Sequence, residues 1–369
     1  MNILFSKHQP DATDEFQSIH RRGFDLGWVK VDKQLPMADS AAILACWKQD
    51  QAVLLPSMIN TLPFQSAIEQ SHHLMQQLLE TEELLPLFDT EPYLSRLQQL
   101  PLLASSAEEH DKQGIEKLYF DAESKEGELI AEGLWCKASW LSFHDDDASL
   151  RFRFSFGMEG FEDVAADPLK QQWAGTLCDA LFPESAAITN DSSLLPLLTE
   201  LLEGEPAFVE RIVYFNAPNG GAQMHHDVER GHAGVVYAQL TGATFWLALA
   251  KPLLIDELIL FAADSNNNDA IQAVLPDEKE RTALSTLLQD RAALAEYMDE
   301  PDHELLEALM DRCPDFNGYL CKRGYGYILQ AGDLLLLPQR DLDHCVWHAV
   351  TCLGDQPGEA LSFALRPKV

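Results

Sequence analysis

The short stretch Met224–Asp227 constrains the fold more than any other feature of the sequence. It reads Met-His-His-Asp and leaves an apolar, strand-like segment through a Gly/Pro-rich turn. On extended backbone, side chains alternate between two faces, so His225 and Asp227 point the same way and His226 points the other way. A third ligand from a distant strand, such as the one containing Trp347–Val350, would complete two imidazoles and one carboxylate on one side of a metal ion. A facial set with open positions is typical of non-haem Fe(II) sites, so the sequence predicts such a site.

Short apolar segments separated by Gly- and Pro-containing turns fill most of residues 206–369. Val235–Leu249 is expected to form a hairpin with its turn near Gly242. Gly326–Pro338 is expected to form a second strand pair, and His348–Arg366 a last hairpin. Strands of this length and spacing predict a double-stranded β-helix, the cupin-like jelly roll, in a chain of the α+β class.

The chain divides into residues 1–205, a mixed and mostly helical region of unknown role, and residues 206–369, the predicted barrel. A charged segment at 254–317 has apolar residues at helical spacing and is expected to be a helical insert, with Asp302 capping one of its helices. Such inserts usually cover a sheet face or rim, and a lid over the site is the alternative. The other elements expected are helices at Gln65–Glu80, Tyr93–Leu100, Pro168–Leu181 and Ser193–Leu202, and a β-hairpin at Trp140–Phe156.

Charge and cysteine content narrow the classes of function. The formal net charge is −33, and no cluster of Lys and Arg is present, which argues against nucleic-acid binding. So acidic a surface indicates either solubility in a salty habitat or electrostatic steering of a basic partner. No apolar run is long enough to span a bilayer, so no membrane partner is expected. The seven cysteines include no CxxC pair, and Met1–Phe16 has no secretory pattern, so reduced thiols and a cytoplasmic location are expected.

The C-terminal 165 residues, apart from the insert, resemble the JmjC-type cupin oxygenases, and among them the ribosomal oxygenases. The shared features are a Val-Tyr lead into His-x-Asp, a Gln-Leu-x-Gly…Trp segment, Gly-Asp-x-Leu-x-x-Pro, a distal His and a closing Ser-x-x-x-Arg strand. The resemblance implies that His225, Asp227 and His348 are the ligands of Fe(II), with 2-oxoglutarate as cosubstrate. His344 has the same strand parity as His348 and is the alternative distal ligand.

The cosubstrate site departs from the pattern of the family. In these enzymes a basic residue two positions after the turn glycine usually grips the far carboxylate of 2-oxoglutarate, and here that position is Thr244. Arg366 is the expected substitute, because it shares strand phase with Ser362 and Arg can hold a carboxylate bidentately. Tyr214 and Thr244 could add hydroxyl hydrogen bonds. Lys251 has the opposite parity and is less suitable.

These observations predict an Fe(II)- and 2-oxoglutarate-dependent hydroxylase, with a protein side chain or a small molecule as substrate. A basic protein is one expected substrate, and the oligomeric state is not predicted. No catalytic residue beyond the metal ligands is predicted. Two alternatives remain: a metal-binding cupin enzyme that does not use 2-oxoglutarate, which Thr244 favours, and a non-catalytic cupin-like binding or scaffold protein. His232 is expected to be an ordinary loop residue, with a substrate contact as the alternative. The Asp145–Asp147 run is expected to be a turn rather than a cation site.

Overall fold

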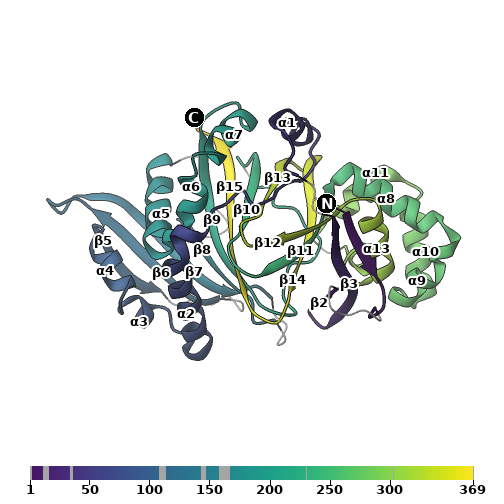
Figure 1. Cartoon of the computed structure of the whole chain (residues 1–369), viewed down its shortest axis with the longest axis horizontal. Helices are drawn as coiled ribbons and strands as arrows, with labels where there is room; N and C mark the ends of the chain where they lie inside the picture. The colour runs from purple at the N-terminus through teal and green to yellow at the C-terminus, as the bar shows by residue number, and fades with distance from the viewer. Residues whose placement is uncertain are drawn as a thin grey trace.

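The computed structural model describes residues 2–10, 16–33, 36–107, 114–142, 147–157, 167–229, 231–301 and 303–368. It combines helices with a large antiparallel sheet, as the predicted α+β class requires. The strands of the second half occupy the middle of the molecule, between two groups of helices (Figure 1). In the described part of the chain, no helix is long and apolar enough to cross a membrane.

Two antiparallel layers form the centre. The first has the strand order β13-β10-β15-β9 and the second has the order β12-β11-β14. A short segment ending at His225 extends the second layer along the free edge of β14. The layers are joined where β13 and β14 pair at Gln339 and Cys345. The bounds are β9 Pro206–Asn216, β10 Gly234–Gln239, β11 Ala243–Ala250, β12 Gly326–Gln330, β13 Leu334–Asp341, β14 His344–Leu353 and β15 Gly358–Pro367.

The three strand pairs predicted in this half are wrong, because β10 and β11, β12 and β13, and β14 and β15 lie in different layers and do not pair. β10 pairs with β13 and β15, whereas β11, which follows it, pairs with β12 and β14. The crossing at Gly242 has a φ of +69°, and a Cβ there would lie 2.8 Å from the Cα of Gly358. Glycine is therefore needed at this crossing for both conformation and space. The hairpin that does form joins β13 to β14, within the expected loop at 339–346.

The first layer continues into the N-terminal half of the chain. β8 pairs with β9, β7 with β8, β6 with β7 and β5 with β6, while β4 pairs with β13. The boundary predicted at residue 205 therefore lies within one continuous sheet. The predicted hairpin at Trp140–Phe156 is confirmed, because Trp140 of β7 pairs with Leu150 of β8. The bounds are β4 Val53–Leu55, β5 Leu102–Ala107, β6 Gly114–Glu123, β7 Leu129–Trp140 and β8 Leu150–Phe156.

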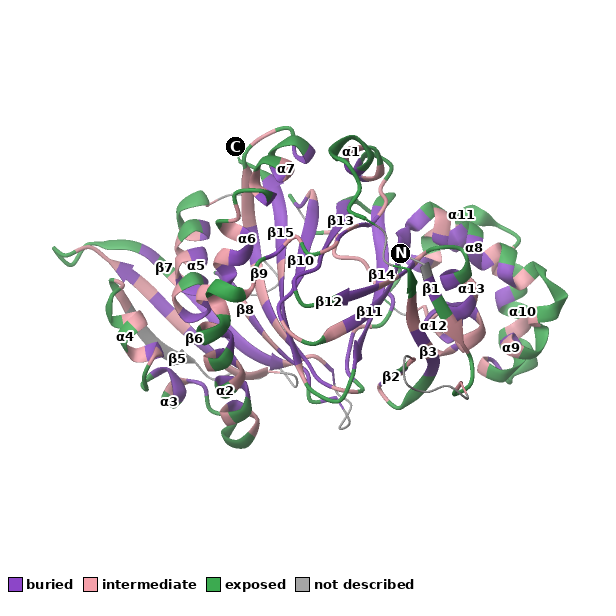
Figure 2. Ribbon diagram, viewed as in Figure 1, coloured by how far each residue is buried: buried purple, intermediate pink, exposed green. Residues whose placement is uncertain are grey.

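The barrel strands are buried on both faces, which explains their nearly continuous apolar sequences (Figure 2). In β13, Leu335 and Leu337 point between the layers, toward Tyr237 and Trp246. Leu334 and Leu336 point outward, into a core shared with the helices of the N-terminal half. These helices are α1 Ser40–Lys48, α2 Gln65–Thr81, α3 Leu85–Phe88, α4 Tyr93–Gln98, α5 Pro168–Leu181, α6 Ala186–Thr189 and α7 Leu194–Leu201, with short 3₁₀ turns at Leu62–Phe64 and Pro183–Ser185. The four helices predicted in residues 1–205 are confirmed as α2, α4, α5 and α7.

The outer face of the second layer is covered by the insert and by a separate small sheet. That sheet comprises β1 Asn2–Ser6, β2 Gln17–Arg21 and β3 Phe24–Lys33, in a region predicted to be helix and loop. The insert spans 251–322, longer at both ends than the predicted 254–317. Its helices are α8 Lys251–Ala263, α9 Asn268–Val274, α10 Glu278–Leu287, α11 Arg291–Met298, α12 Glu304–Arg312 and α13 Pro314–Lys322, with a 3₁₀ turn at Ser265–Asn267. The predicted cap Asp302 lies outside the described residues, as do Asp145 and Asp146.

Candidate metal centre

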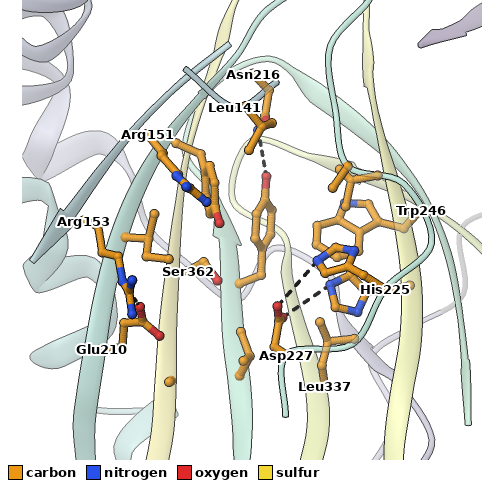
Figure 3. A pocket seen from close by; sticks show the side chains of 18 of the residues that line it. Leu141, Arg151, Arg153, Glu210, Asn216, His225, Asp227, Trp246, Leu337 and Ser362 are labelled. Carbon is orange, nitrogen blue, oxygen red and sulfur yellow. Dashed lines mark hydrogen bonds and ion pairs between the residues drawn. The ribbon is translucent and has the colours of Figure 1, made fainter. Parts of the chain in front are cut away.

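His225, Asp227 and His348 meet between the two layers. The Nε2 atom of His225 lies 3.5 Å from Oδ1 of Asp227, and Nε2 of His348 lies 3.4 Å from Oδ2 of the same carboxylate. The two imidazole centroids are 4.3 Å apart (Figure 3). Residues separated by more than 120 positions in the sequence thus present three side-chain donor atoms to one point.

Backbone pairing produces this meeting. The amide of His225 donates to the carbonyl of His348 at 3.0 Å, and the amide of His348 donates to the carbonyl of His225 at 2.8 Å. The segment approaches β14 closely just before this bridge, because a Cβ at Gly221 would lie 2.1 Å from the carbonyl oxygen of Val350. The glycine before the His-x-Asp motif is therefore required for the two histidines to come into register.

The residues present fit a divalent metal ion. The three side chains offer one ligand atom each, and these atoms lie within 4.8 Å of one another. With metal–ligand bonds of about 2.1 Å, neighbouring donors at angles near 90–110° lie about 3.0–3.4 Å apart. The distances of 3.4 and 3.5 Å from Asp227 to the two imidazoles need almost no adjustment. Two imidazoles and one carboxylate suit Fe(II), and they leave the other side of the ion open.

The protonation states of Asp227 and His348 favour a metal ion, whereas the raised pKa of His225 does not. Burial lowers the pKa of His348 to about 4, and the nearby His225 contributes to this shift. Burial opposes ionisation of Asp227, but His348 and His225 outweigh it and lower the pKa of the carboxyl. Burial would lower the pKa of His225, but Asp227 raises it overall. At neutral pH, Asp227 is therefore ionised and His348 is neutral, which are the forms that bind metals.

A buried ion pair outside the cavity fixes the approach to His225. Arg21 of β2 and Asp311 of α12 lie 2.6 Å apart, with side chains 4% and 2% exposed. Oδ1 of Asp311 accepts the amide of Met224 at 2.8 Å, and Arg21 donates to the carbonyl of Ala222 at 2.9 Å. The insert and the N-terminal sheet together therefore hold the segment that carries the first two ligands. None of the described insert residues lines the cavity, so the insert supports the site and does not close it.

A cavity of about 380 Å³ opens beside the three ligands. One wall is aromatic: the ring of Trp246 stacks on His348 with centroids 5.4 Å apart and planes at 23°, and Tyr237 packs against Trp246. Tyr237, Phe245 and Trp246 are all buried, with Phe245 on the outer face of its layer.

Thr244 does not line this cavity. Its hydroxyl accepts a hydrogen bond from Nε1 of Trp246 at 2.9 Å and donates to Oε1 of Gln239 at 2.8 Å. The hydroxyl of Tyr237 also donates to that Gln239 oxygen at 3.3 Å and accepts from Asn216 at 3.0 Å. This network satisfies the polar groups around Thr244 internally. Thr244 is 0% exposed, which leaves no space there for a carboxylate.

Arg366 is also absent from the cavity lining. Ser362 and Ala364 of β15 line the cavity, but Arg366 lies near the end of the strand, opposite Ala207. An irregularity in the register between Ala364 and Leu365 interrupts the regular pairing before this point. The shared parity of Ser362 and Arg366 is therefore not enough to bring the arginine to the site.

The basic side chains of the cavity wall come instead from β8 and from the turn after β2. Arg151 and Arg153 of β8 line the cavity (Figure 3). Arg22 and Tyr214 of β9 line it as well. Arg151 pairs in register with Tyr214, and its Nε donates to Ser139 Oγ at 3.0 Å. The alternation of Arg with Phe in Leu150–Phe156 was visible in the sequence, but the partner strand that makes this face a cavity wall was not.

The other histidines are distributed as follows. His344 lies at the exposed turn of the β13–β14 hairpin, and its Nδ1 is 2.8 Å from Oδ1 of Asp341. It precedes His348 by four residues on β14 and is not one of the three side chains that meet. His226 points away from the ligands and packs on Trp347, as predicted. His232, expected in a loop, is buried and lines the cavity. His72 of α2 is half-buried, and its Nε2 lies 2.9 Å from Thr241 Oγ1.

Lys251 is buried beside Asp299, at 2.7 Å, and is not in the cavity. Asp147, the described member of the predicted aspartate turn, accepts hydrogen bonds from Ser142 and from the amide of Ser149. All seven cysteines are free thiols.

No protein-family model and no curated protein matches the chain. Among solved structures, it is similar to Escherichia coli ycfD, a ribosomal oxygenase, with a TM-score of 0.32, 13% identity, and coverage of 91% of this chain and 54% of that one. It is also similar to an oxidoreductase of the 2OG-Fe(II) oxygenase family from Burkholderia pseudomallei, with a TM-score of 0.33, 8% identity, and coverage of 90% and 93%. The chain spans about half the length of the E. coli protein.

Proposed function

We propose that this chain is a non-haem Fe(II) oxygenase built on a double-stranded β-helix. The observation that carries the proposal is the convergence of His225, Asp227 and His348 on one side of a cavity, with ligand atoms 3.4–3.5 Å apart around a single carboxylate. The two layers, and the crossings between them from β10 to β11, from β12 to β13 and from β14 to β15, support the β-helix. When bound, Fe(II) in such a set supplies the redox chemistry that activates O2 for insertion of oxygen into a C–H bond.

The residues of the chain orient the ligands. The stacked ring of Trp246 and the carbonyl of Val346, near Nδ1 of His348, restrict rotation of that imidazole. Nδ1 of His225 lies 2.7 Å from the carbonyl of Gln223, which leaves its Nε2 directed to the ligand point. Outer contacts of this kind fix the orientation of metal-binding imidazoles and raise metal affinity.

We further propose that 2-oxoglutarate is the cosubstrate and that Arg151 holds its far carboxylate. The usual position, Thr244, is closed by its own hydrogen bonds, and Arg366 lies outside the cavity. Arg151 projects into the cavity from β8, and Tyr214 beside it offers a hydroxyl. A guanidinium whose Nε is anchored, here by Ser139, retains two NH2 groups for bidentate contact with a carboxylate.

The substrate is proposed to be a protein side chain or a small molecule. A basic protein suits the net charge of −33, because opposite charges accelerate association. The free cysteines fit the cytoplasm, where thiols remain reduced.

Succinate release by purified protein with Fe(II), ascorbate and 2-oxoglutarate tests the proposal. Asp227→Ala should abolish release, because it removes the carboxylate between the two imidazoles. His344→Gln should release succinate at the native rate, since this histidine lies at an exposed turn. Arg151→Gln should raise the KM for 2-oxoglutarate, whereas Arg366→Gln should leave it unchanged. Succinate release that persists in Asp227→Ala would refute the metal assignment.

A second candidate is a metal-dependent cupin enzyme that does not use 2-oxoglutarate. The closed network around Thr244 favours it, because the family's usual carboxylate grip is missing. Iron retention without binding of 2-oxoglutarate would support this candidate. Failure to retain any divalent metal would instead support a non-catalytic scaffold.

A further inference from the structure

A second group of metal-binding side chains lies in the same cavity and shares no residue with the first. His232, Glu210 and Glu229 each offer one ligand atom, and these atoms lie within 4.8 Å of one another. All three residues line the cavity. Glu210 belongs to β9, whereas Glu229 and His232 belong to the connection between Asp227 and β10.

His232 is the residue that sets this group apart from an ordinary acidic cluster. The residue is 6% exposed, and neither Nδ1 nor Nε2 has a hydrogen-bond partner among the described residues. A buried polar group without a partner costs about 1–3 kcal/mol. A cation bound to the lone pair of one ring nitrogen would remove part of that cost.

The local backbone gives the group a fixed shape. The amide of His232 donates to the carbonyl of Glu229 at 3.1 Å, so a tight turn holds these two residues together. The next amide, of Ala233, donates to the carbonyl of Leu365 at 2.7 Å and ties the turn to β15. Glu210 lies on β9, on the other side of β15, opposite Ala364. Two neighbouring strands and one turn therefore position all three side chains.

We propose that His232, Glu210 and Glu229 bind a second divalent cation, beside the His225–Asp227–His348 centre. One imidazole and two carboxylates suit Zn(II), Mn(II) or Fe(II), whereas Mg(II) and Ca(II) prefer oxygen ligands alone. The charge of the group also suits a cation. Its two carboxylates carry more negative charge than the guanidinium of Arg153, which contacts Oε1 of Glu210, can neutralise. This inference does not depend on the proposed oxygenase activity.

Arg153 gives the site a distinctive response. The cation and the Arg153 guanidinium would both contact the Glu210 carboxylate, and they would repel each other because both are positively charged. Arg153→Gln should therefore raise the affinity of the second site several-fold and leave the first site unchanged. A cluster without metal affinity would show no such gain.

Titration of the metal-free full chain with Mn(II) and with Zn(II), followed by calorimetry and by metal analysis after gel filtration, tests the proposal. The native chain should bind two equivalents. His232→Gln and Glu229→Gln should each bind one, as should Asp227→Asn, and the double variant with Asp227→Asn and Glu229→Gln should bind none. Glu229 is exposed, so its substitution should leave the fold intact, and Glu300→Gln, also exposed, is the matched control.

Two results would overturn the inference: a single equivalent in the native chain that Asp227→Asn loses and His232→Gln keeps, or two equivalents that survive both Glu229→Gln and His232→Gln. A single equivalent that is lost only in Asp227→Asn would support the metal centre of the proposed function and refute the second site. A single equivalent that is lost only in His232→Gln would support the second site and refute the metal centre of the proposed function.

Discussion

Removal of the Arg21–Asp311 ion pair is predicted to affect both the stability of the protein and its metal centre, because this buried pair contacts the segment that leads to His225. Both side chains are almost fully buried, 2.6 Å apart, and the same Asp311 oxygen accepts the amide of Met224, the residue before His225. Burial lowers the pKa of Arg21, and Asp311 opposes that shift. Asp311→Ala would leave a buried guanidinium without its carboxylate.

The expected cost of Asp311→Ala is about 3–5 kcal/mol of unfolding free energy, the usual range when one partner of a buried pair is removed. Loss of the bond to the Met224 amide should also weaken Mn(II) binding at the His225 centre by about tenfold, as for other outer contacts of metal ligands. Urea unfolding of the metal-free protein gives the first quantity, and calorimetric titration gives the second.

Two controls separate the buried charge from other effects. The double variant with Arg21→Met and Asp311→Leu should recover most of the stability, because no uncompensated charge remains. Asp315→Ala removes the more exposed Lys7–Asp315 pair of the same insert and should cost less than about 1 kcal/mol. If Asp311→Ala costs no more than Asp315→Ala, or leaves Mn(II) affinity unchanged, the insert does not support the site in the way described.

Three further predictions concern single side chains. Burial raises the pKa of both Glu184 and Glu359, so the folded state holds protons that the unfolded chain releases. The free energy of unfolding should therefore fall as the pH rises above the ordinary glutamate pKa of 4.5. Glu359→Gln should flatten this pH dependence in urea unfolding between pH 5 and 8. The fall should approach about 1.4 kcal/mol per pH unit for each proton that the folded pair retains, until the pH passes the raised pKa. Thr244→Arg should lower stability by about 1–3 kcal/mol or more, because the position is fully buried, and the melting temperature should fall without any gain in 2-oxoglutarate affinity. His348→Gln should abolish Mn(II) binding at the first centre in calorimetry, whereas His344→Gln should bind as the native chain does.

The placement of His225 and Asp227 on one face was accessible from the sequence because it is local, whereas His348 was assigned from the resemblance to a known family. A period of two places His225 and Asp227 on one face of any extended segment, and the apolar stripe of Gln65–Glu80 identifies its helix in the same way. The pairing of strands is not local. The turn at Gly242 looks the same whether the chain reverses into a hairpin or crosses to another layer, so only the long-range partners of β10 and β11 distinguish the two.

The same limit explains the cavity residues that the sequence left unassigned. Alternating Arg and Phe in β8 predict a half-buried strand, but the face that carries Arg151 and Arg153 could border solvent or a cavity. The pairing of β8 with β9 makes it cavity. His232 had no pattern around it, and only the fold shows that its ring is buried against two carboxylates.

The position of β15 has a consequence for biosynthesis. This strand lies between β9 and β10 and pairs with both. In addition, β4 pairs with β13, which follows it by some 280 residues in the sequence. While the ribosome is still translating the last segment, β9 and β10 each expose an unpaired edge of apolar backbone, the kind of surface that aggregates. Protection by a chaperone during this interval should therefore increase the yield of soluble chain, and a nascent chain stalled before residue 358 should remain sensitive to protease.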